Sequence, residues 1–248
     1  APWARIAGRL PAFSFFGGKR MYRSIALITL LFAVVSALTL ITSVPVGWKF
    51  LFLVLVFAAL FGGFSYREKQ RWPELWAIWT FSTVVSVFQV LPDWFLSQVL
   101  GVLVFPEDGL FKFGTVSGYM AGLWAIPFFF TLLAARSYQG SFSSTQWLSH
   151  GFSVRAGGVA AAVALLIFAT SEATLWILGS WYARDVMMLG HVALYVLIPE
   201  ALLGFFLYQY FHTSQGQRPL VVVLNGLKVS ILYTGCLALS YLFLEKVA

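Results

Sequence analysis

The chain has 248 residues, of which 60% are hydrophobic and 10% charged, and its mean hydropathy is +0.85. Soluble domains carry about a quarter charged residues, so this composition excludes a water-soluble globular fold. The formal net charge is +7, but five basic residues precede the first apolar run. There they indicate topology rather than a nucleic-acid surface, and we expect no nucleic-acid partner. The single cysteine, Cys236, excludes an intramolecular disulfide framework.

Residues 1–23 precede any apolar run and contain Gly8, Pro11, Gly17 and Gly18, so we expect an interfacial arm rather than a long helix. The sequence then predicts an all-α polytopic integral membrane bundle of about seven transmembrane helices, because a span needs about 20 apolar residues. These helices form one domain over 24–243, in contact with membrane lipids, and residues 244–248 form a tail. The predicted spans are 24–44, 47–65, 75–92, 115–135, 156–178, 188–210 and 220–243.

Basic residues alternate between the loops, as they do in membrane proteins whose basic loops stay in the cytoplasm. This pattern predicts an N-terminus on the cytoplasmic or stromal side and a C-terminus on the opposite side. The membrane is either a bacterial inner membrane or an organellar, thylakoid-type membrane. The N-terminal arm and the loops 66–74, 136–155 and 211–219 hold most of the Lys and Arg: Arg5, Arg9, Lys19, Arg20, Arg23, Arg67, Lys69, Arg71, Arg136, Arg155 and Arg218.

A short pattern occurs twice and suggests an internal repeat. Each copy reads acid-x-x-Leu, a loop, Val-x-x-Tyr and then Ile-Pro within a helix. Chance remains an alternative, because aromatic-rich membrane chains often contain such patterns. A true duplication would make helices 2–4 and 5–7 two three-helix repeats behind one additional helix. The first copy contains Asp93, Leu96, Val116, Tyr119 and Ile126-Pro127, and the second contains Glu172, Leu175, Val192, Tyr195 and Ile198-Pro199.

Ionisable residues within a span need a partner, a cavity or an edge position. Glu200 and Lys228 lie at similar depths from the same face, at about 1.5 Å per residue, so we expect a buried Glu200–Lys228 ion pair. The pair would serve as a structural lock between the sixth and seventh helices. Two alternatives remain: Glu200 acts as a general acid or proton carrier, or Lys228 snorkels to the inner face.

Four polar residues lie near the outer boundary and could line one shallow pocket: Asp93, Glu172, Asp185 and His191. Interfacial solvation, with an ion pair to Arg184, is the explanation that we favour for them. Their spacing matches no metal-binding motif, so we predict no metal. The His191 imidazole could ligate a haem or chlorophyll, although no facing histidine exists for a bis-histidine haem.

Several enzyme classes are disfavoured because their motifs are absent. The chain has no Gly-rich nucleotide loop, no Ser–His–Asp arrangement and no aspartate-rich diphosphate motif. A retinal Schiff base at Lys228 lacks a counterion in the third helix. A transporter needs a polar path at the midplane, for which Glu200 and Lys228 alone give little support.

The segment Ile198-Pro199-Glu200-Ala201-Leu202-Leu203-Gly204-Phe205-Phe206, with Tyr195 before it, resembles the lycopene cyclase domain family. Ile126-Pro127-Phe128-Phe129-Phe130 offers the corresponding segment of the first half. The resemblance implies two three-helix membrane units that act on carotenoid ends. It also has departures, because that family has acids directly after both prolines, whereas this chain has Phe128 and Phe129 in the first half and only Glu200 in the second.

Two functions follow as hypotheses. The first is a non-catalytic subunit that holds a pigment, isoprenoid or lipid and packs against other integral membrane subunits, in a setting that the resemblance would make photosynthetic. Carotenoid or chlorophyll would then be bound near His191, Trp124 and Tyr195. The second is an intramembrane enzyme that acts on an isoprenoid or lipid, cyclase-like or hydratase-like, with Glu200 as the acid and Asp93 and Glu172 assisting.

Overall fold

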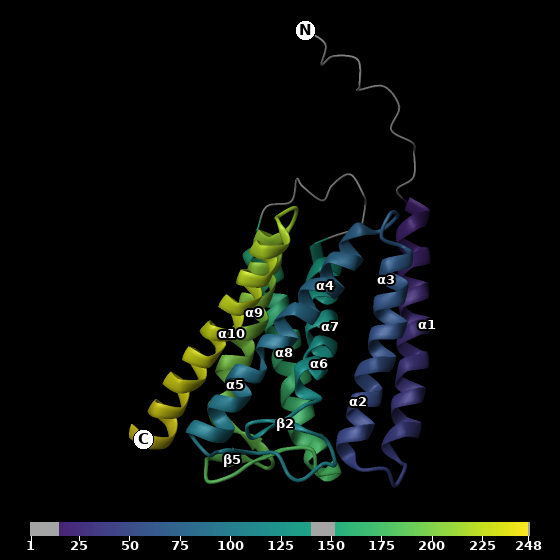
Figure 1. Ribbon diagram of the computed structural model, residues 1–248. Coiled ribbons are helices and arrows are strands. Elements are labelled where there is room, and N and C mark those ends of the chain that lie inside the picture. The colour runs from purple at the N-terminus through teal and green to yellow at the C-terminus, as the bar shows by residue number, and fades with distance from the viewer. Residues whose placement is uncertain (1–14, 140–151, 248) are drawn as a thin grey trace, which may run out of the picture.

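Seven long apolar helices dominate the computed structural model, which describes residues 15–139 and 152–247 (Figure 1). Within this described part, all seven are long and apolar enough to cross a membrane. The predicted all-α polytopic membrane bundle is therefore confirmed. The spans are α1 (Phe15–Leu40); α2 (Val46–Phe57) continued by η2 (Ala58–Gly62) and α3 (Gly63–Arg67); α4 (Pro73–Phe88) continued by α5 (Val90–Trp94) and η3 (Phe95–Val99); α6 (Met120–Leu123) and α7 (Ala125–Gln139); α8 (Val154–Leu175) with η4 (Trp176–Leu178); α9 (Leu194–Ser214); and α10 (Pro219–Tyr241) with η5 (Leu242–Val247).

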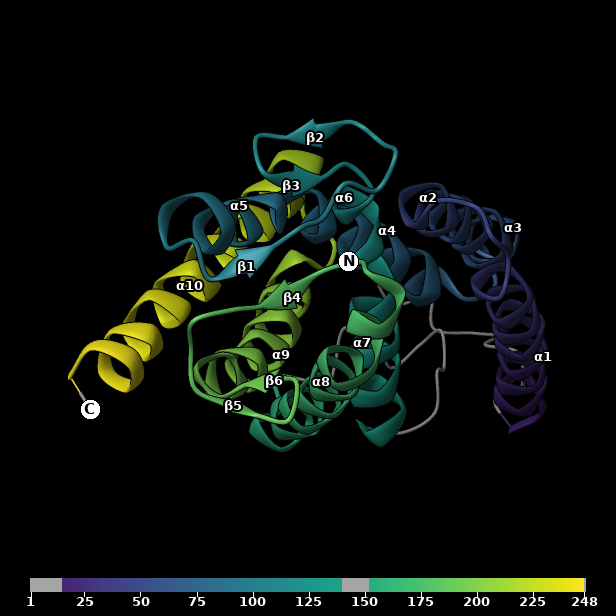
Figure 2. The same ribbon diagram turned by 90° about the horizontal axis from the view of Figure 1, so that it is seen from below.

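Short strands occur at one end of the bundle, which we call the hairpin end (Figure 2). Two hairpins form there, β2 with β3 and β5 with β6, and β1 pairs antiparallel with β4. Most of the Lys and Arg residues in the described part of the chain lie at helix ends and loops of the opposite end, the start of α1 included, and we call this end the basic end (Figure 1). The strands are β1 (Leu103–Val104), β2 (Lys112–Phe113), β3 (Val116–Ser117), β4 (Tyr182–Ala183), β5 (Met188–Leu189) and β6 (Val192–Ala193).

Three predicted span starts differ from the structure by five residues or more. The fourth and sixth spans begin at Met120 and Leu194 rather than at 115 and 188, because a hairpin precedes each helix. The first helix already begins at Phe15, since glycines near a helix end cost little. The remainder of the predicted arm, residues 1–14, and the end of the predicted tail, residue 248, lie outside the described residues.

The third span continues beyond its predicted end because a neighbouring helix compensates for Pro92. A proline has no backbone N–H and leaves the carbonyl four residues earlier without its helical partner. Here that carbonyl belongs to Phe88, and it accepts a hydrogen bond of 2.6 Å from the Ser230 hydroxyl of α10. The helix therefore kinks at Gln89 and continues to Val99.

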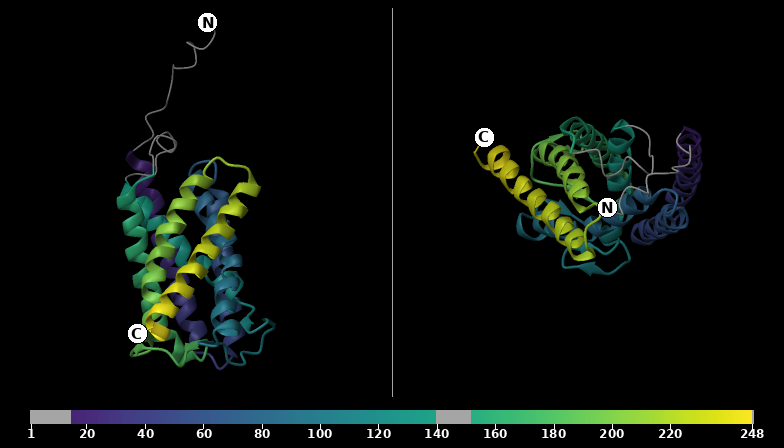
Figure 3. Two further views of the ribbon diagram at one scale, coloured as in Figure 1. Left: turned by 90° about the vertical axis from the view of Figure 1, so that its left-hand side faces the viewer. Right: turned by 90° about the horizontal axis from the view of Figure 1, so that it is seen from above.

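The interior of the bundle is enclosed by α4, α7, α8, α9 and α10, and α1 and α2 stand to one side (Figures 2 and 3). Around this ring α4 contacts α7, α7 contacts α8, α8 contacts α9, and α10 contacts both α9 and α4. Small residues allow a close approach between α8 and α9, where a Cβ on Gly204 would collide with the Ala160 carbonyl oxygen. The ring therefore depends on glycine at that crossing.

The predicted repeat has a structural counterpart, but its unit is two helices joined through a hairpin. The two-residue turns Gly114-Thr115 and Gly190-His191 have matching glycines with φ of 61° and 65°. Strand β1 begins ten residues after Asp93 (103 − 93), and β4 begins ten residues after Glu172 (182 − 172). The α4–α7 segment thus corresponds to α8–α9, and the repeating unit is not the expected three-helix half.

The pairing of β1 with β4 fits a local twofold relation between these units. Leu103 pairs with Ala183, and Val104 pairs with Tyr182. The first residue of each strand pairs with the second residue of the other strand, as a twofold axis between antiparallel strands requires. This antiparallel pair therefore joins the two units at the hairpin end.

Candidate functional site

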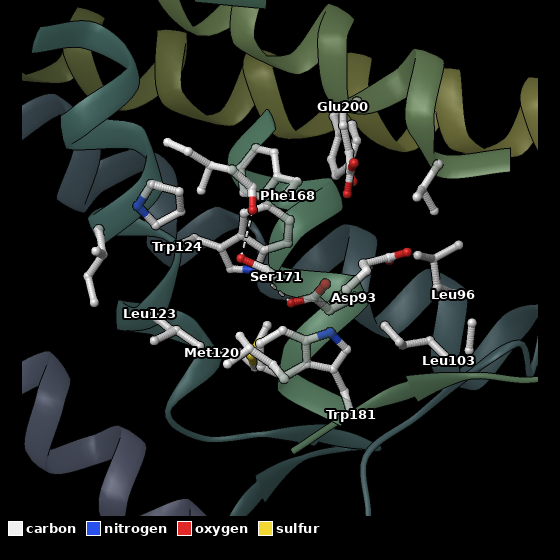
Figure 4. Close-up of a pocket in the computed structure, with 18 of the residues that line it drawn as sticks. Asp93, Leu96, Leu103, Met120, Leu123, Trp124, Phe168, Ser171, Trp181 and Glu200 are labelled. Atoms are coloured by element: carbon white, nitrogen blue, oxygen red, sulfur yellow. Dashed lines mark hydrogen bonds between the residues drawn. The ribbon is translucent and has the colours of Figure 1, made fainter. Parts of the chain in front are cut away.

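A cavity of about 350 Å³ lies inside the ring, in the half of the bundle nearer the hairpin end (Figure 4). Its lining is mostly apolar and aromatic and comes from both repeated units and from α10. Cavities of this kind are where membrane bundles hold small hydrophobic ligands. The lining residues are Asp93, Leu96, Leu103, Phe105, Met120, Leu123, Trp124, Ile126, Pro127, Phe130, Ile167, Phe168, Ser171, Glu172, Leu175, Trp181, Ala183, Tyr195, Val196, Glu200 and Tyr233.

Three carboxyl groups line this cavity, each from a different helix. Asp93 lies on α5, Glu172 on α8 and Glu200 on α9. Asp93 and Glu200 are buried, with 3% and 4% of their surfaces exposed, whereas Glu172 is half-buried. Buried carboxyl groups inside a bundle are costly, so their convergence on one cavity marks it as the candidate site.

The three carboxyl groups differ in their hydrogen bonds. The Trp124 indole donates to Asp93 Oδ2 at 2.9 Å, and the Ala193 backbone N–H donates to Glu172 Oε2 at 3.0 Å. Glu200 Oε2 is buried without a hydrogen-bond partner among the described residues. In Figure 4 the Glu200 carboxyl group points into the cavity. Glu200 is therefore the carboxyl whose bonding capacity is left for a ligand.

Glu200 and Trp124 occupy equivalent positions in the two repeated units. Each follows the tyrosine after its hairpin by five residues, Glu200 after Tyr195 (200 − 195) and Trp124 after Tyr119 (124 − 119). The first unit thus places an indole donor where the second places a carboxyl group. This difference makes the cavity chemically asymmetric, with a satisfied carboxyl at Asp93 and an unsatisfied one at Glu200.

Aromatic side chains complete the walls of the cavity. Trp124 packs on Phe168 with a centroid distance of 4.9 Å and on Tyr233 at 6.1 Å. Towards the hairpin end, the buried Tyr119 hydroxyl donates to the Ser180 carbonyl at 3.1 Å and so ties the two units together. Burial raises the pKa of the Tyr119 phenol, which keeps this hydroxyl a donor.

A family model described as a domain of unknown function, DUF6989, matches residues 90–244. That segment is more than half of the 248-residue chain. The chain belongs to the DUF6989 family. Comparisons with curated proteins and with solved structures found no match. The DUF6989 segment contains every residue that lines the cavity, from Asp93 to Tyr233, and excludes α1, α2 and α3.

The structure brings together five of the residues singled out in the sequence. Asp93, Glu172 and Glu200, the three predicted acids, share the cavity with Trp124 and Tyr195, two of the predicted ligand-binding residues. Within the described residues, no group of three His, Cys, Asp or Glu side chains is arranged to hold a metal ion. The roles assigned to these residues remain predictions.

The expected Glu200–Lys228 ion pair is not formed. Lys228 is exposed, and its Nζ lies 6.0 Å from the centroid of the Tyr210 ring, whereas Glu200 faces the cavity. Among the described residues, a buried ion pair instead joins Arg136 at the end of α7 to Glu74 at the start of α4. Equal depth along two helices therefore did not place Glu200 and Lys228 on facing sides.

His191 lies outside the large cavity. It is exposed on the turn between β5 and β6 and stacks on Trp176 with a centroid distance of 3.7 Å. Asp185 is also outside, where its Oδ2 lies 4.0 Å from Arg184 Nε as the interfacial interpretation expects. Pigment ligation by His191 remains a prediction.

Sequence reasoning missed several of the residues that line the cavity. Phe168, Ser171 and Tyr233 lie within long apolar helices, and Trp181 lies in an interfacial loop. Aromatic residues are common throughout this chain, so their type alone carried no signal. Ser171 lies one residue before Glu172, and this proximity was the only local indication.

Proposed function

We propose that this integral membrane protein binds a hydrophobic molecule, an isoprenoid or a lipid, in the cavity between its two repeated units. The observation that carries the proposal is the unpartnered Glu200 Oε2 in an otherwise apolar, aromatic cavity. Such a site suits a ligand with an apolar body and one polar or reactive group. A volume of about 350 Å³ suits a compact molecule or one end of a longer chain.

A cavity-filling variant tests this proposal. Ser171→Phe places a ring in the cavity, and Leu166→Phe places the same ring on the 68%-exposed outer face of α8 as a matched control. Both variants and the native protein are purified in mild detergent, extracted with organic solvent and analysed by mass spectrometry and absorption spectroscopy. The native protein and Leu166→Phe should retain a defined hydrophobic molecule that Ser171→Phe loses. Identical extracts from all three proteins would refute the proposal.

Acid catalysis on a bound isoprenoid is a second candidate function, favoured by the convergence of three carboxyl groups. In its acid form, Glu200 would transfer a proton to one carbon of an alkene, so that an O–H bond breaks and a C–H bond forms. The resulting carbocation would close a ring onto a neighbouring double bond. Loss of a proton to a second carboxylate, Asp93 or Glu172, would then restore an alkene.

Glu200→Gln separates this chemistry from binding, because glutamine keeps the shape of the side chain but cannot act as the acid. The measurement is the carotenoid content of lycopene-accumulating bacterial cells that express each variant. Native protein should yield cyclised product, and Glu200→Gln should reduce it by about 100-fold or more. Glu245→Gln changes a carboxyl group outside the cavity and should behave as native protein. Full product formation by Glu200→Gln would eliminate Glu200 as the acid.

The proposed orientation places the basic end in the cytoplasm or stroma, supported by the Lys and Arg of its loops. The membrane would be a bacterial inner membrane or a thylakoid-type membrane. Association with other integral membrane subunits is proposed for α1, whose outward residues Leu27, Leu30 and Leu38 are all more than half exposed. A photosynthetic setting, with a carotenoid or chlorophyll as the ligand, belongs to the same proposal.

A further inference from the structure

A second, smaller pocket of about 250 Å³ adjoins the large cavity at the hairpin end. It is built mainly from the loop between α8 and α9, which carries β4, β5 and β6. Its lining residues are Glu172, Trp176, Trp181, Tyr182, Ala183, Met188 and His191. Several of these side chains are exposed, with Tyr182 at 45% and Met188 at 43%. The small pocket therefore opens to the exterior at the hairpin end.

Three residues line both the small pocket and the large cavity: Glu172, Trp181 and Ala183. The two spaces are therefore adjacent and share these three side chains as a common boundary. Of these three residues, Glu172 carries the ionisable side chain, and the Ala193 N–H holds its Oε2 at 3.0 Å. A carboxyl group fixed at this junction meets anything that passes between the exterior and the cavity.

We propose that the small pocket is the aqueous entrance to the large cavity and that Glu172 makes this entrance selective for cations, protons included. The inference rests on the proposed function, because a cavity that binds a ligand or transfers protons needs a route to water. A passage lined by charge of one sign raises the local concentration of the opposite charge. Glu172 would have this effect at the junction, with Asp93 and Glu200 beyond it.

The groups that face Glu172 are consistent with this selectivity. Inside the large cavity they are Asp93 from α5, Tyr195 and Glu200 from α9, and Tyr233 from α10. In the small pocket the facing titratable groups are Tyr182 and His191. Arg184 is directed elsewhere and donates from Nε to the Gly101 carbonyl at 2.9 Å. The described lining of both spaces contains no Lys or Arg side chain that would oppose a cation.

Cysteine accessibility tests both parts of the proposal. Cys236→Ser removes the single native thiol, after which Ser171→Cys reports on the large cavity and Ala183→Cys on the junction, each with little change in size. The proteins are reconstituted in phosphatidylcholine vesicles and treated with membrane-impermeant methanethiosulfonates, one cationic and one anionic. These reagents need a thiolate in contact with water.

Control positions define the two sides of the membrane. Asp185→Cys reports the hairpin end, where its side chain is 88% exposed, and Arg67→Cys reports the basic end, where its side chain is 84% exposed. Leu166→Cys, on the outer face of α8, reports reaction from the lipid phase. In the double variant of Ala183→Trp and Ser171→Cys, the tryptophan obstructs the junction between the two spaces and the cysteine reports whether reagent still reaches the large cavity.

The expected result is that Ala183→Cys and Ser171→Cys react from the side that labels Asp185→Cys, and that Ala183→Trp blocks the reaction at Ser171→Cys. Relative to Asp185→Cys, the cationic reagent should be preferred at Ser171→Cys by about tenfold. Glu172→Gln should abolish that preference and leave the accessibility unchanged. Labelling of Ser171→Cys at the Leu166→Cys rate, or from the basic end, overturns the entrance. A preference that survives Glu172→Gln overturns the role of Glu172.

This outcome is independent of the ligand-binding test. Ser171→Phe can expel a bound lipid even where no thiol in the cavity is reached from water, and in that case the cavity binds a ligand but the small pocket is not its entrance. Conversely, rapid labelling of Ser171→Cys in a protein that retains no bound molecule would support the entrance and refute the proposed ligand binding.

Discussion

At the scale of single residues, the most buried salt bridge among the described residues lies at the basic end. Arg136 on α7 donates from Nε to Glu74 Oε1 on α4, and 15% and 4% of the two side chains are exposed. A second guanidinium nitrogen donates to Gln139. Because both charges are largely removed from water, their pairing offsets part of the cost of burying them.

We predict that Arg136→Met destabilises the bundle by about 3–5 kcal/mol, because the buried Glu74 carboxylate loses the charge of Arg136. The double variant Glu74→Gln with Arg136→Met should recover most of this loss. Unfolding in mixed micelles, followed by circular dichroism, gives the free energy of unfolding of the single and the double variant. Arg67→Met removes an exposed contact of 4.0 Å to Glu68 and should cost less than about 1 kcal/mol. Equal losses in the single and double variants would contradict the buried-charge explanation.

The sequence pointed to the cavity residues that are ionisable and stand within apolar segments. Asp93, Glu172 and Glu200 stood out because carboxyl groups in apolar runs need a cavity, a partner or an edge, and all three line the cavity. The partner of Glu200 could not be predicted in the same way. Depth along a helix says nothing about which face a residue occupies, and on α10 the buried face carries Val229 and Ser230 while Lys228 is exposed.

At the scale of elements, the helices were predictable because hydrophobic length alone determines a membrane span. The hairpins were missed, because the predicted fourth and sixth spans took strands β3, β5 and β6 for the beginnings of helices. The continuation of the third span past Pro92 was equally hidden, since it depends on the Ser230 hydroxyl more than a hundred residues away. Local patterns therefore predicted which segments span the membrane, and distant contacts decided where they end.

The hairpins also change how the internal repeat is understood. The matching Ile-Pro pairs suggested equivalent positions, yet Pro127 follows Tyr119 by eight residues (127 − 119) and Pro199 follows Tyr195 by four (199 − 195). Counting from the hairpins instead aligns Trp124 with Glu200. The units were recognisable from short motifs, but their register depends on backbone pairing, which only the structure supplies.

At the scale of the whole molecule, the bundle divides into a ring that holds the cavity and a peripheral pair of helices. The helix α2 is attached to the ring at two places. Its Gly47 N–H donates to the Asp108 carbonyl, in the loop between β1 and β2, at 3.0 Å, and its Val54 side chain lies against Gly122 of α6. By contrast, α1 packs mainly on α2 and η2, with Phe32 meeting Phe57 and Phe61 at 5.9 Å. In the most apolar stretch of α1, within Met21–Leu40, only 6% of the residues are buried.

This division predicts that α1 separates from the remainder without loss of the cavity. A protease site is inserted in the exposed loop 41–45, and the purified protein is cleaved in mild detergent. Residues 45–248 should keep a thermal transition within about 4 °C of the intact protein and the same bound molecule, because α1 adds little buried area and no residue to the cavity. Gel filtration should resolve the α1 fragment from the ring.

Cleavage in the loop between α3 and α4 is the matched control. There the α1–α3 fragment should remain bound to the ring through Gly47 and Val54, because these contacts bury backbone and side chain against the hairpin loop and α6. If α1 alone also remained bound, or if its release emptied the cavity, the division into ring and periphery would be wrong. If α1 is released and the cavity stays intact, α1 has no part in ligand binding. Its apolar outer face then serves for packing against lipid or another subunit in the membrane.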